Sequence, residues 1–322
     1  MKKDIAEKSL LEEDDVFADI ANVNLFNGAQ TILPENLQCA PTTGYYRSQD
    51  GKQRMLFRDV AKQINGLHGT IAFIGFENQS AISNIMPVRA MGYNYTSYMK
   101  QVDDLIAENR KNKNPAFSKE IHDWQRLKPV ATYILYYGTE KWEKPVSLMD
   151  MLDVSEQDKD FWGTLIDDYK IKVIHMANQP ESVRKKYKSD YRVIADFLAC
   201  KKDKDALKTV LRDNEQKLVH VPQVLDMLDA LSGDNRFEEM KQCYNGCDET
   251  KKEEGVNMCE LFDMVEEDGI KKGIKQGIEQ GLKLGADIFK VVRSGINDNN
   301  EIAEICNCKV EDVENVRLSF EI

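Results

Sequence analysis

The chain has 322 residues, a formal net charge of −11 and 31% charged residues. This length is sufficient for two domains or for one domain with appendages. The acidic balance argues against a protein that coats nucleic acid with a broad basic surface, although a local basic groove remains compatible with it.

The N-terminal residues, the length of the apolar runs and the cysteines together predict where the protein is located. The first residues, Met1 to Lys8, do not form the apolar segment of a signal peptide. No apolar run approaches membrane-spanning length, so no membrane partner is expected. The seven cysteines are an odd number and are scattered, which favours a reduced, cytoplasmic protein over a disulfide framework.

Residues 1 to about 30 are predicted to form an entry helix. Asp15 and Asp19 lie four residues apart and therefore share one face of it. Either acid is a candidate metal ligand, and a solvated helix start that complements the helix dipole is the alternative.

Two strands are predicted next, over Gln53–Gln63 and Gly69–Gln79, after a turn at Ser48–Gly51. The second contains the almost wholly apolar run from Thr70 to Ile74, which is typical of a strand buried on both faces.

Asp59 and Glu77 stand at the ends of these two strands, and side-chain alternation points Gln79 the same way as Glu77. Two carboxylates that converge at a strand end can bind a hard divalent cation such as Mg²⁺, which could activate water against a phosphodiester. The alternative is that the acids only form ion pairs with Arg58, Lys62 or Arg89.

A helix is predicted from Met86 to about Asn109, then a loop over Lys111–Pro115 and strands over Pro129–Tyr137 and Lys170–His175. Strands separated by helices predict an α/β layered core. Arg89 and Tyr93 share a face of the helix close to the proposed site. They are candidates for contacting phosphate, with packing or a salt bridge as the alternative.

Residues 180 to 245 have a helical pattern. The stretch from Arg184 to Arg212 is rich in basic residues, and Tyr187 and Tyr191 could stack on bases. Interleaved acids leave a solvated helix face as the alternative.

Glycine recurs every four residues from Gly269 to Gly285, and the first four of these glycines are each followed by Ile or Leu. Each Gly costs a helix about 0.5–1 kcal/mol relative to Ala, so this repeat favours close helix packing against a second copy. A weakly helical linker is the alternative. The residues from about 286 to 319 are predicted to form a small helical tail similar to helix-turn-helix units, and its acidic third helix favours assembly over DNA reading.

The chain from about Glu12 to Leu152 resembles the PD-(D/E)XK nuclease family transposases, which are related to the recombination-promoting nucleases. The resemblance is carried by ordered segments: Asp15–Asp19 with Asn24–Phe26, Arg58–Lys62, Ile74–Gln79, Met86–Tyr93, and Leu135–Gly138 with Trp142 and Ser147–Leu148.

This resemblance implies a restriction-endonuclease-like core, a mixed central sheet flanked by helices, with a helical C-terminal extension. It also implies that Asp59 and Glu77 bind catalytic Mg²⁺ or Mn²⁺, with Asp15 or Asp19 as a further ligand. The family's Lys falls at Gln79, which can orient water or phosphate but supplies no positive charge.

The sequence thus predicts a metal-dependent DNA endonuclease linked to recombination or mobile elements, and a homo-oligomer through the Gly-repeat helix. A catalytically silent, oligomerising protein that keeps the nuclease fold is the alternative. Four parts are predicted: a core over 1–178, a helical subdomain over 179–247, an acidic then Gly-repeat linker over 248–285, and a tail over 286–322.

Overall fold

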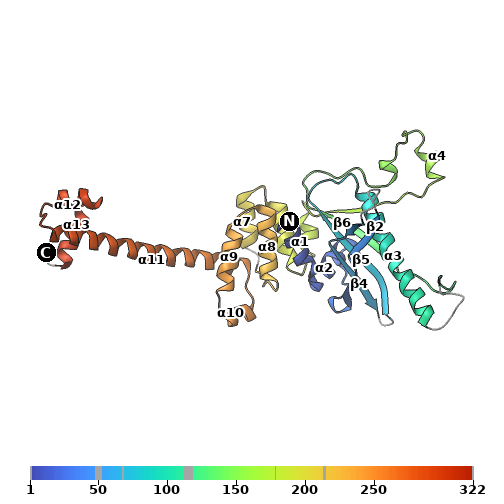
Figure 1. Ribbon diagram of the computed structural model, residues 1–322, viewed down its shortest axis with the longest axis horizontal. Helices are drawn as coiled ribbons and strands as arrows, with labels where there is room; N and C mark the ends of the chain where they lie inside the picture. Colours follow the sequence, from blue (N-terminus) through green and yellow to red (C-terminus); the bar gives the residue numbers. More distant parts are fainter. Residues whose placement is uncertain are drawn as a thin grey trace. The chain divides into compact units, whose positions relative to one another are not determined.

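The computed structural model describes residues 2–47, 53–66, 69–111, 119–177, 179–212 and 215–320 (Figure 1). The chain separates into two compact units, Met1–Gln242 with Asp248–Cys259, and Cys243–Cys247 with Glu260–Ile322. The first unit combines a mixed sheet with helices, so the predicted α/β class is confirmed. The predicted division into four parts remains a prediction.

Five strands of the first unit form an open sheet in the order β1-β4-β5-β6-β7. Their bounds are β1 (Leu37–Cys39), β4 (Val60–Gly66), β5 (Gly69–Gln79), β6 (Val130–Tyr136) and β7 (Lys172–His175). The pairs β1–β4 and β4–β5 are antiparallel, and β5–β6 and β6–β7 are parallel. The bounds predicted for β5 are confirmed, and its central place agrees with its continuous apolar run.

The prediction of a single strand over Gln53–Gln63 is wrong, because Arg58 and Asp59 interrupt the strand. Residues before this interruption form β3 (Gln53–Phe57), which pairs with β2 (Thr43–Arg47) in a separate two-stranded sheet. Residues after it form β4 of the main sheet. The predicted turn at Ser48–Gly51 and most of the predicted loop after Lys111 lie outside the described residues.

The predicted entry helix is two helices, α1 (Lys2–Glu12) and α2 (Asp14–Leu25). The chain turns at Glu13, whose backbone is extended (φ −68°, ψ 127°). The buried Lys62 of β4 fixes the turn, because its Nζ donates to the carbonyl of Glu12 at 2.7 Å and to Asp14 Oδ1 at 2.8 Å.

Helices cover both faces of the sheet. On one face, Phe17 of α2 packs on Phe76 of β5 with their ring centroids 4.5 Å apart. Because side chains alternate along a strand, Gly75 and Glu77 lie on the other face. The helix α3 (Met86–Lys111) covers that face, and Met86 and Ala90 share a buried cluster with Ile134 and other residues of β6 and its surroundings.

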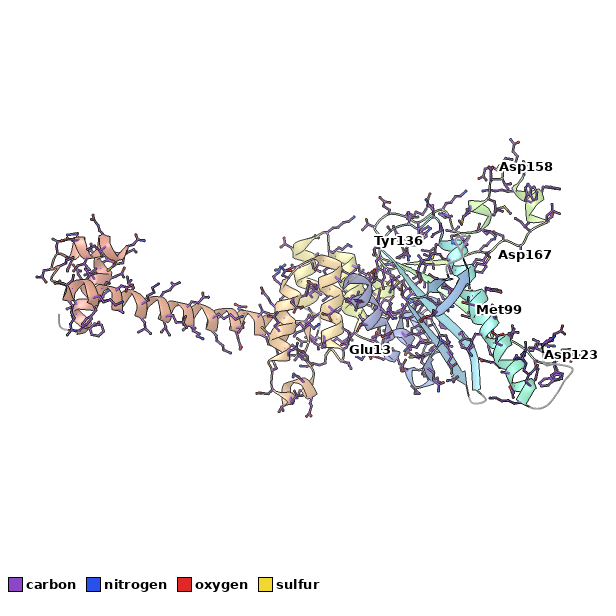
Figure 2. All side chains as sticks on the ribbon, in the orientation of Figure 1. Glu13, Met99, Asp123, Tyr136, Asp158 and Asp167 are labelled. Atoms are coloured by element: carbon purple, nitrogen blue, oxygen red, sulfur yellow. The ribbon has the colours of Figure 1, made fainter. Side chains whose placement is uncertain are left out.

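The segment between β6 and β7 carries the short helix α4 (Lys159–Gly163) away from the sheet, and Figure 2 marks Asp158 and Asp167 on it. The figure also marks Met99 on α3 and Tyr136 at the end of β6. Tyr136 lies edge-on to Trp142 with 5.2 Å between the ring centroids, which closes the sheet against this segment.

The rest of the first unit is helical, as predicted for residues 180 to 245. Amphipathic stripes pack α6 on α8, and α8 also packs on α1 of the N-terminal pair. The helices are α5 (Glu181–Arg184), α6 (Tyr191–Cys200), α7 (Lys204–Arg212), α8 (Val221–Ser232), α9 (Arg236–Asn245) and α10 (Glu249–Glu254).

In the second unit, the Gly repeat lies within one continuous helix, α11 (Met258–Arg293). The start of the predicted tail, from about residue 286, therefore continues α11 and does not form a separate helix. The tail helices α12 (Asn299–Cys306) and α13 (Val310–Phe320) pack on its end around Ile288, which is fully buried. Among the described helices, none has both the length and the apolar character needed to span a membrane.

The fold predicts a stability effect at Gly75, where a Cβ would lie only 2.1 Å from Cδ of Arg58. Arg58 is buried and anchored, so it cannot move aside freely. We expect Gly75→Ala to lower the free energy of unfolding by about 1–3 kcal/mol in urea denaturation. Gly163→Ala is the matched control, since no atom lies within 4 Å of the Cβ it adds. Equal stability of the two variants would contradict this packing.

Candidate functional site

The candidate site lies where the end of β5 meets the start of β4. The two strands are antiparallel, with Val60 opposite Phe76, so Asp59 arrives beside the last residues of β5. The backbone N–H of Asn78 donates to Asp59 Oδ2 at 2.7 Å. Strand geometry therefore places the Asp59 carboxyl next to Glu77, as the sequence predicted.

Glu77 is the most constrained side chain of this group. It is 2% exposed, and its Oε1 accepts hydrogen bonds from Arg89 Nη2 at 2.6 Å and from Gln79 Nε2 at 3.2 Å. Its Oε2 is buried and finds no partner at hydrogen-bond geometry among the described residues, although the hydroxyl of Tyr93 and the backbone N–H of Asp59 lie near the carboxyl and oppose the rise in its pKa. An unsatisfied carboxylate oxygen in such a place destabilises the ionised form.

The electrostatics follow from this burial. Loss of hydration, and then the nearby charge of Asp59, raise the pKa of Glu77 to about 8, against the opposing attraction of Arg89. Burial also raises the pKa of Asp59, and the hydrogen bond from Asn78 opposes that rise. The two carboxyls thus compete for one cation.

That cation is Arg89 of α3, the ion-pair partner that the sequence left as an alternative. Its Nε and Nη2 donate to the hydroxyl of Tyr93 at 3.1 Å and 2.7 Å. Burial raises the pKa of Tyr93, so its hydroxyl keeps its proton. The Arg89 side chain is about a third exposed, whereas that of Glu77 is buried.

Arg58 is a member of this site that the sequence treated only as an ion-pair partner. Its side chain lies across Gly75, and its Nη2 donates to the carbonyl of Tyr93 at 3.0 Å and to Ser97 Oγ at 2.8 Å. A glycine inside a buried strand often marks the close approach of another group, and Gly75 is the sequence feature that could have indicated the position of Arg58.

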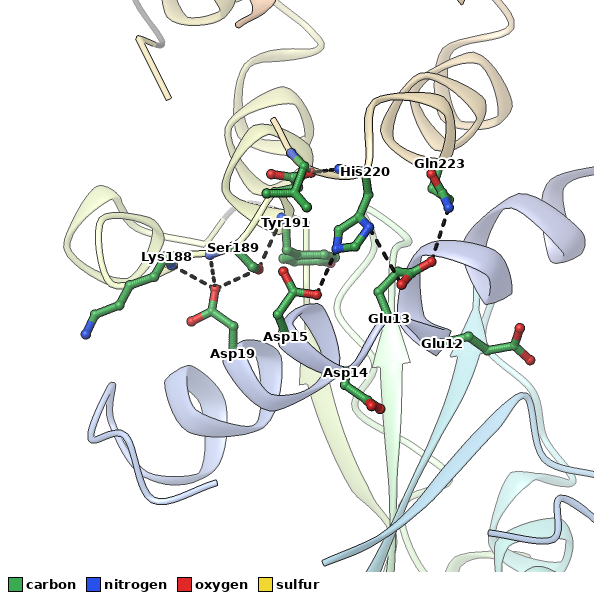
Figure 3. Close-up of polar contacts among 12 residues, drawn as sticks. Glu12, Glu13, Asp14, Asp15, Asp19, Lys188, Ser189, Tyr191, His220 and Gln223 are labelled. Carbon is green, nitrogen blue, oxygen red and sulfur yellow. Dashed lines mark hydrogen bonds and ion pairs between the residues drawn. The ribbon is translucent and has the colours of Figure 1, made fainter. Parts of the chain in front are cut away.

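The two acids predicted from the first helix are not brought to Glu77. Figure 3 shows both on α2 with their partners: Asp15 Oδ1 lies 2.8 Å from His220 Nε2, and Asp19 Oδ2 accepts from Ser189 and Lys188. Each Asp19 contact is 2.8 Å long. These acids connect α2 to the helical part of the unit.

Charges of α1 influence Asp59 instead. Asp4 raises the pKa of Asp59 and Lys8 lowers it, after the larger effects of burial, of the Asn78 hydrogen bond and of Arg89. Neither residue was a candidate from the sequence, because both fall on an unremarkable charged helix start.

The basic stretch after Arg184 does not present the aromatic surface that the sequence suggested. Tyr187 and Tyr191 are buried, with 5.1 Å between their ring centroids, so neither can stack on a base. Arg184 and Arg192 both bind Asp196, at 2.7 Å and 2.5 Å. The predicted stacking is wrong because both rings face the core.

The donor set is that of a site with two carboxylates. Within the described ranges, no group of three or more His, Cys, Asp or Glu residues is arranged to hold a metal ion. Mg²⁺ is commonly held by one or two carboxylates and keeps several waters. The unsatisfied Oε2 of Glu77 beside Asp59 is compatible with that mode.

Comparisons with known proteins give no match: no family model matches the chain, and no curated protein or solved structure matches it significantly.

The raised pKa of Glu77 predicts a pH-dependent stability. Between its unfolded pKa near 4.5 and its folded pKa of about 8, the folded state binds more protons than the unfolded state, so stability falls as pH rises. Glu77→Gln removes this loss. We expect the difference in free energy of unfolding between the variant and the wild type to grow, in favour of the variant, by about 1–3 kcal/mol as the pH rises from 5 to 8.

Urea denaturation of both proteins at pH 5, 6.5 and 8 measures this gain. Asp160→Asn, an exposed acid of α4, is the control and should show no such trend. A stability difference between Glu77→Gln and wild type that stays constant over this range would contradict the assignment.

Proposed function

We propose that the end of β5 is the active site of a divalent-cation-dependent nuclease that hydrolyses phosphodiester bonds in DNA. One observation carries the proposal: a buried carboxylate, Glu77, keeps one oxygen without a hydrogen bond among the described residues, beside a second carboxyl, Asp59. A bound cation would supply the partner that this oxygen lacks and offset the repulsion between the two acids.

Asp59 and Glu77 would hold Mg²⁺ or Mn²⁺. When bound, the cation would lower the pKa of a water and neutralise charge on the phosphate. The hydrogen bond from Asn78 orients Asp59, and Gln79 holds the other oxygen of Glu77. Gln79 is thus a positioning residue in this structure, and its amide would be the group that hydrogen-bonds water or phosphate at the site.

Arg89 would change its role when the cation binds. Its guanidinium now donates a hydrogen bond to Glu77 and is partly exposed. With a divalent cation on Glu77, this fork of donors becomes available to a phosphate oxygen, the geometry for which arginine is suited. Tyr93 fixes its position through the paired hydrogen bonds to its hydroxyl.

Membership of the PD-(D/E)XK nuclease transposases is proposed on the ordered sequence segments, together with the mixed sheet in which β5 has an antiparallel and a parallel neighbour. A restriction-endonuclease-like core, a role in recombination or mobile elements, and a cytoplasmic location are part of the same proposal. Gln79 in place of the family's Lys is the main departure from the pattern.

The second proposal is self-association through α11, either alongside nuclease activity or in its place in a catalytically silent protein. It rests on an exposed aliphatic row: Ile270, Ile274, Ile278 and Leu282 are each more than half exposed. The adjacent glycines have open space around the position of a Cβ. A second copy of the helix could cover the row at close approach.

Cleavage of supercoiled plasmid DNA tests the nuclease proposal. We expect the wild type to nick or linearise DNA with Mg²⁺ or Mn²⁺, and Asp59→Ala and Glu77→Gln to lose at least about a hundredfold in rate. Asp160→Asn is the charge-matched control and should cleave normally. Absence of metal-dependent cleavage by wild type on supercoiled, linear and single-stranded DNA would contradict the proposal, and so would full activity of both site variants.

Analytical ultracentrifugation tests self-association. We expect the wild type to sediment as an oligomer and the double variant Ile274→Glu/Ile278→Glu to dissociate to monomers, because charges would be buried in the interface. Lys275→Glu, between them in sequence but on another side of the helix, is the control. A monomeric wild type at about 100 μM would contradict the proposal.

A further inference from the structure

A hollow of about 180 Å³ lies on the same face of the sheet as Glu77, between β4, β5 and α3. Phe73 contributes to its wall, four residues before Glu77 on β5. At the rise of a strand, this separation corresponds to about 13 Å. Arg58, across Gly75, lies between the hollow and the proposed active site and lines the hollow.

The notable feature of this hollow is the buried and incompletely hydrogen-bonded side chain of Arg58. The side chain is 3% exposed, yet its Nε is buried and donates no hydrogen bond to any residue in the described parts of the chain. No carboxylate within those parts forms an ion pair with it either, since the nearby Glu77 is bonded to Arg89. Burial lowers the pKa of Arg58, and the nearby charge of Glu77 opposes that effect.

Other groups around the hollow complement an anion. Lys100 of α3 lines it and is more than half exposed, paired with Asp104 one turn along the helix. The charged residues that line the hollow are Arg58, Lys100 and Asp104, so the lining carries a net charge of +1. Thr42 and Ser97 add hydroxyl groups to the lining.

We propose that this hollow is an oxyanion site that takes a phosphate group, bound by Arg58 and Lys100. Its size suits a phosphate, and the Phe73 wall gives an attached sugar or base an apolar surface. The phosphate comes either from a nucleic acid strand that continues to Glu77 or from a free nucleotide. The site stands on its own geometry and requires no hydrolysis, so it can be tested apart from the nuclease proposal.

Isothermal titration with inorganic phosphate, on full-length protein in EDTA, tests this site. We expect saturable binding of phosphate with a dissociation constant below about 20 mM. Lys100→Gln should weaken it about three- to fivefold. Lys111→Gln removes the same charge from the same helix outside the hollow and should have no effect. Arg58→Lys should weaken binding at least about tenfold, because a lysine cannot reproduce the guanidinium fork.

A deoxynucleoside monophosphate and a short single-stranded DNA are titrated in the same way. If the DNA strand binds more tightly than the other two ligands, and Lys100→Gln weakens its binding as it weakens phosphate binding, the site belongs to a nucleic acid backbone. Equal affinity for phosphate, the monophosphate and the strand assigns the site to a free phosphate. No saturable phosphate binding, or equal weakening in Lys100→Gln and Lys111→Gln, overturns the proposal. That pair of variants decides it even if Arg58→Lys does not fold.

Discussion

The burial of one carboxyl, Glu77, at the end of the central strand is the constraint on which the proposed site depends. Strand alternation fixes its direction, and the antiparallel entry of β4 brings Asp59 beside it. Two acids in a place that excludes water are costly, and the structure compensates with one partly exposed cation, Arg89. The remaining unsatisfied oxygen is the feature that a fold optimised for stability alone would eliminate.

The surroundings of Glu77 follow from this cost. Tyr93 orients Arg89 through its hydroxyl and anchors Arg58 through its carbonyl, so one residue of α3 positions both guanidinium groups. Arg58 fits over the strand only because residue 75 has no side chain. The face of β5 that α3 covers is therefore lined with fixed donors, an arrangement suited to anionic ligands.

Local pattern predicted β5 and the pairing of Asp59 with Glu77, because a strand's apolar run and its alternation are short-range properties. The partners of the α2 acids could not be predicted in this way. His220 lies 205 residues from Asp15, and Ser189 lies 170 residues from Asp19. Whether an exposed-looking acid binds a metal or a distant helix depends on tertiary contacts that periodicity does not contain.

Direct measurement of cation binding tests the central claim most closely, because it does not depend on finding the right DNA. Electron paramagnetic resonance of Mn²⁺ titrated with protein reports bound metal. The account predicts a saturable site in the wild type that is lost in Asp59→Ala and in Glu77→Gln and retained in Asp160→Asn. A wild type that leaves Mn²⁺ free, or a site unaffected by Glu77→Gln, would contradict it.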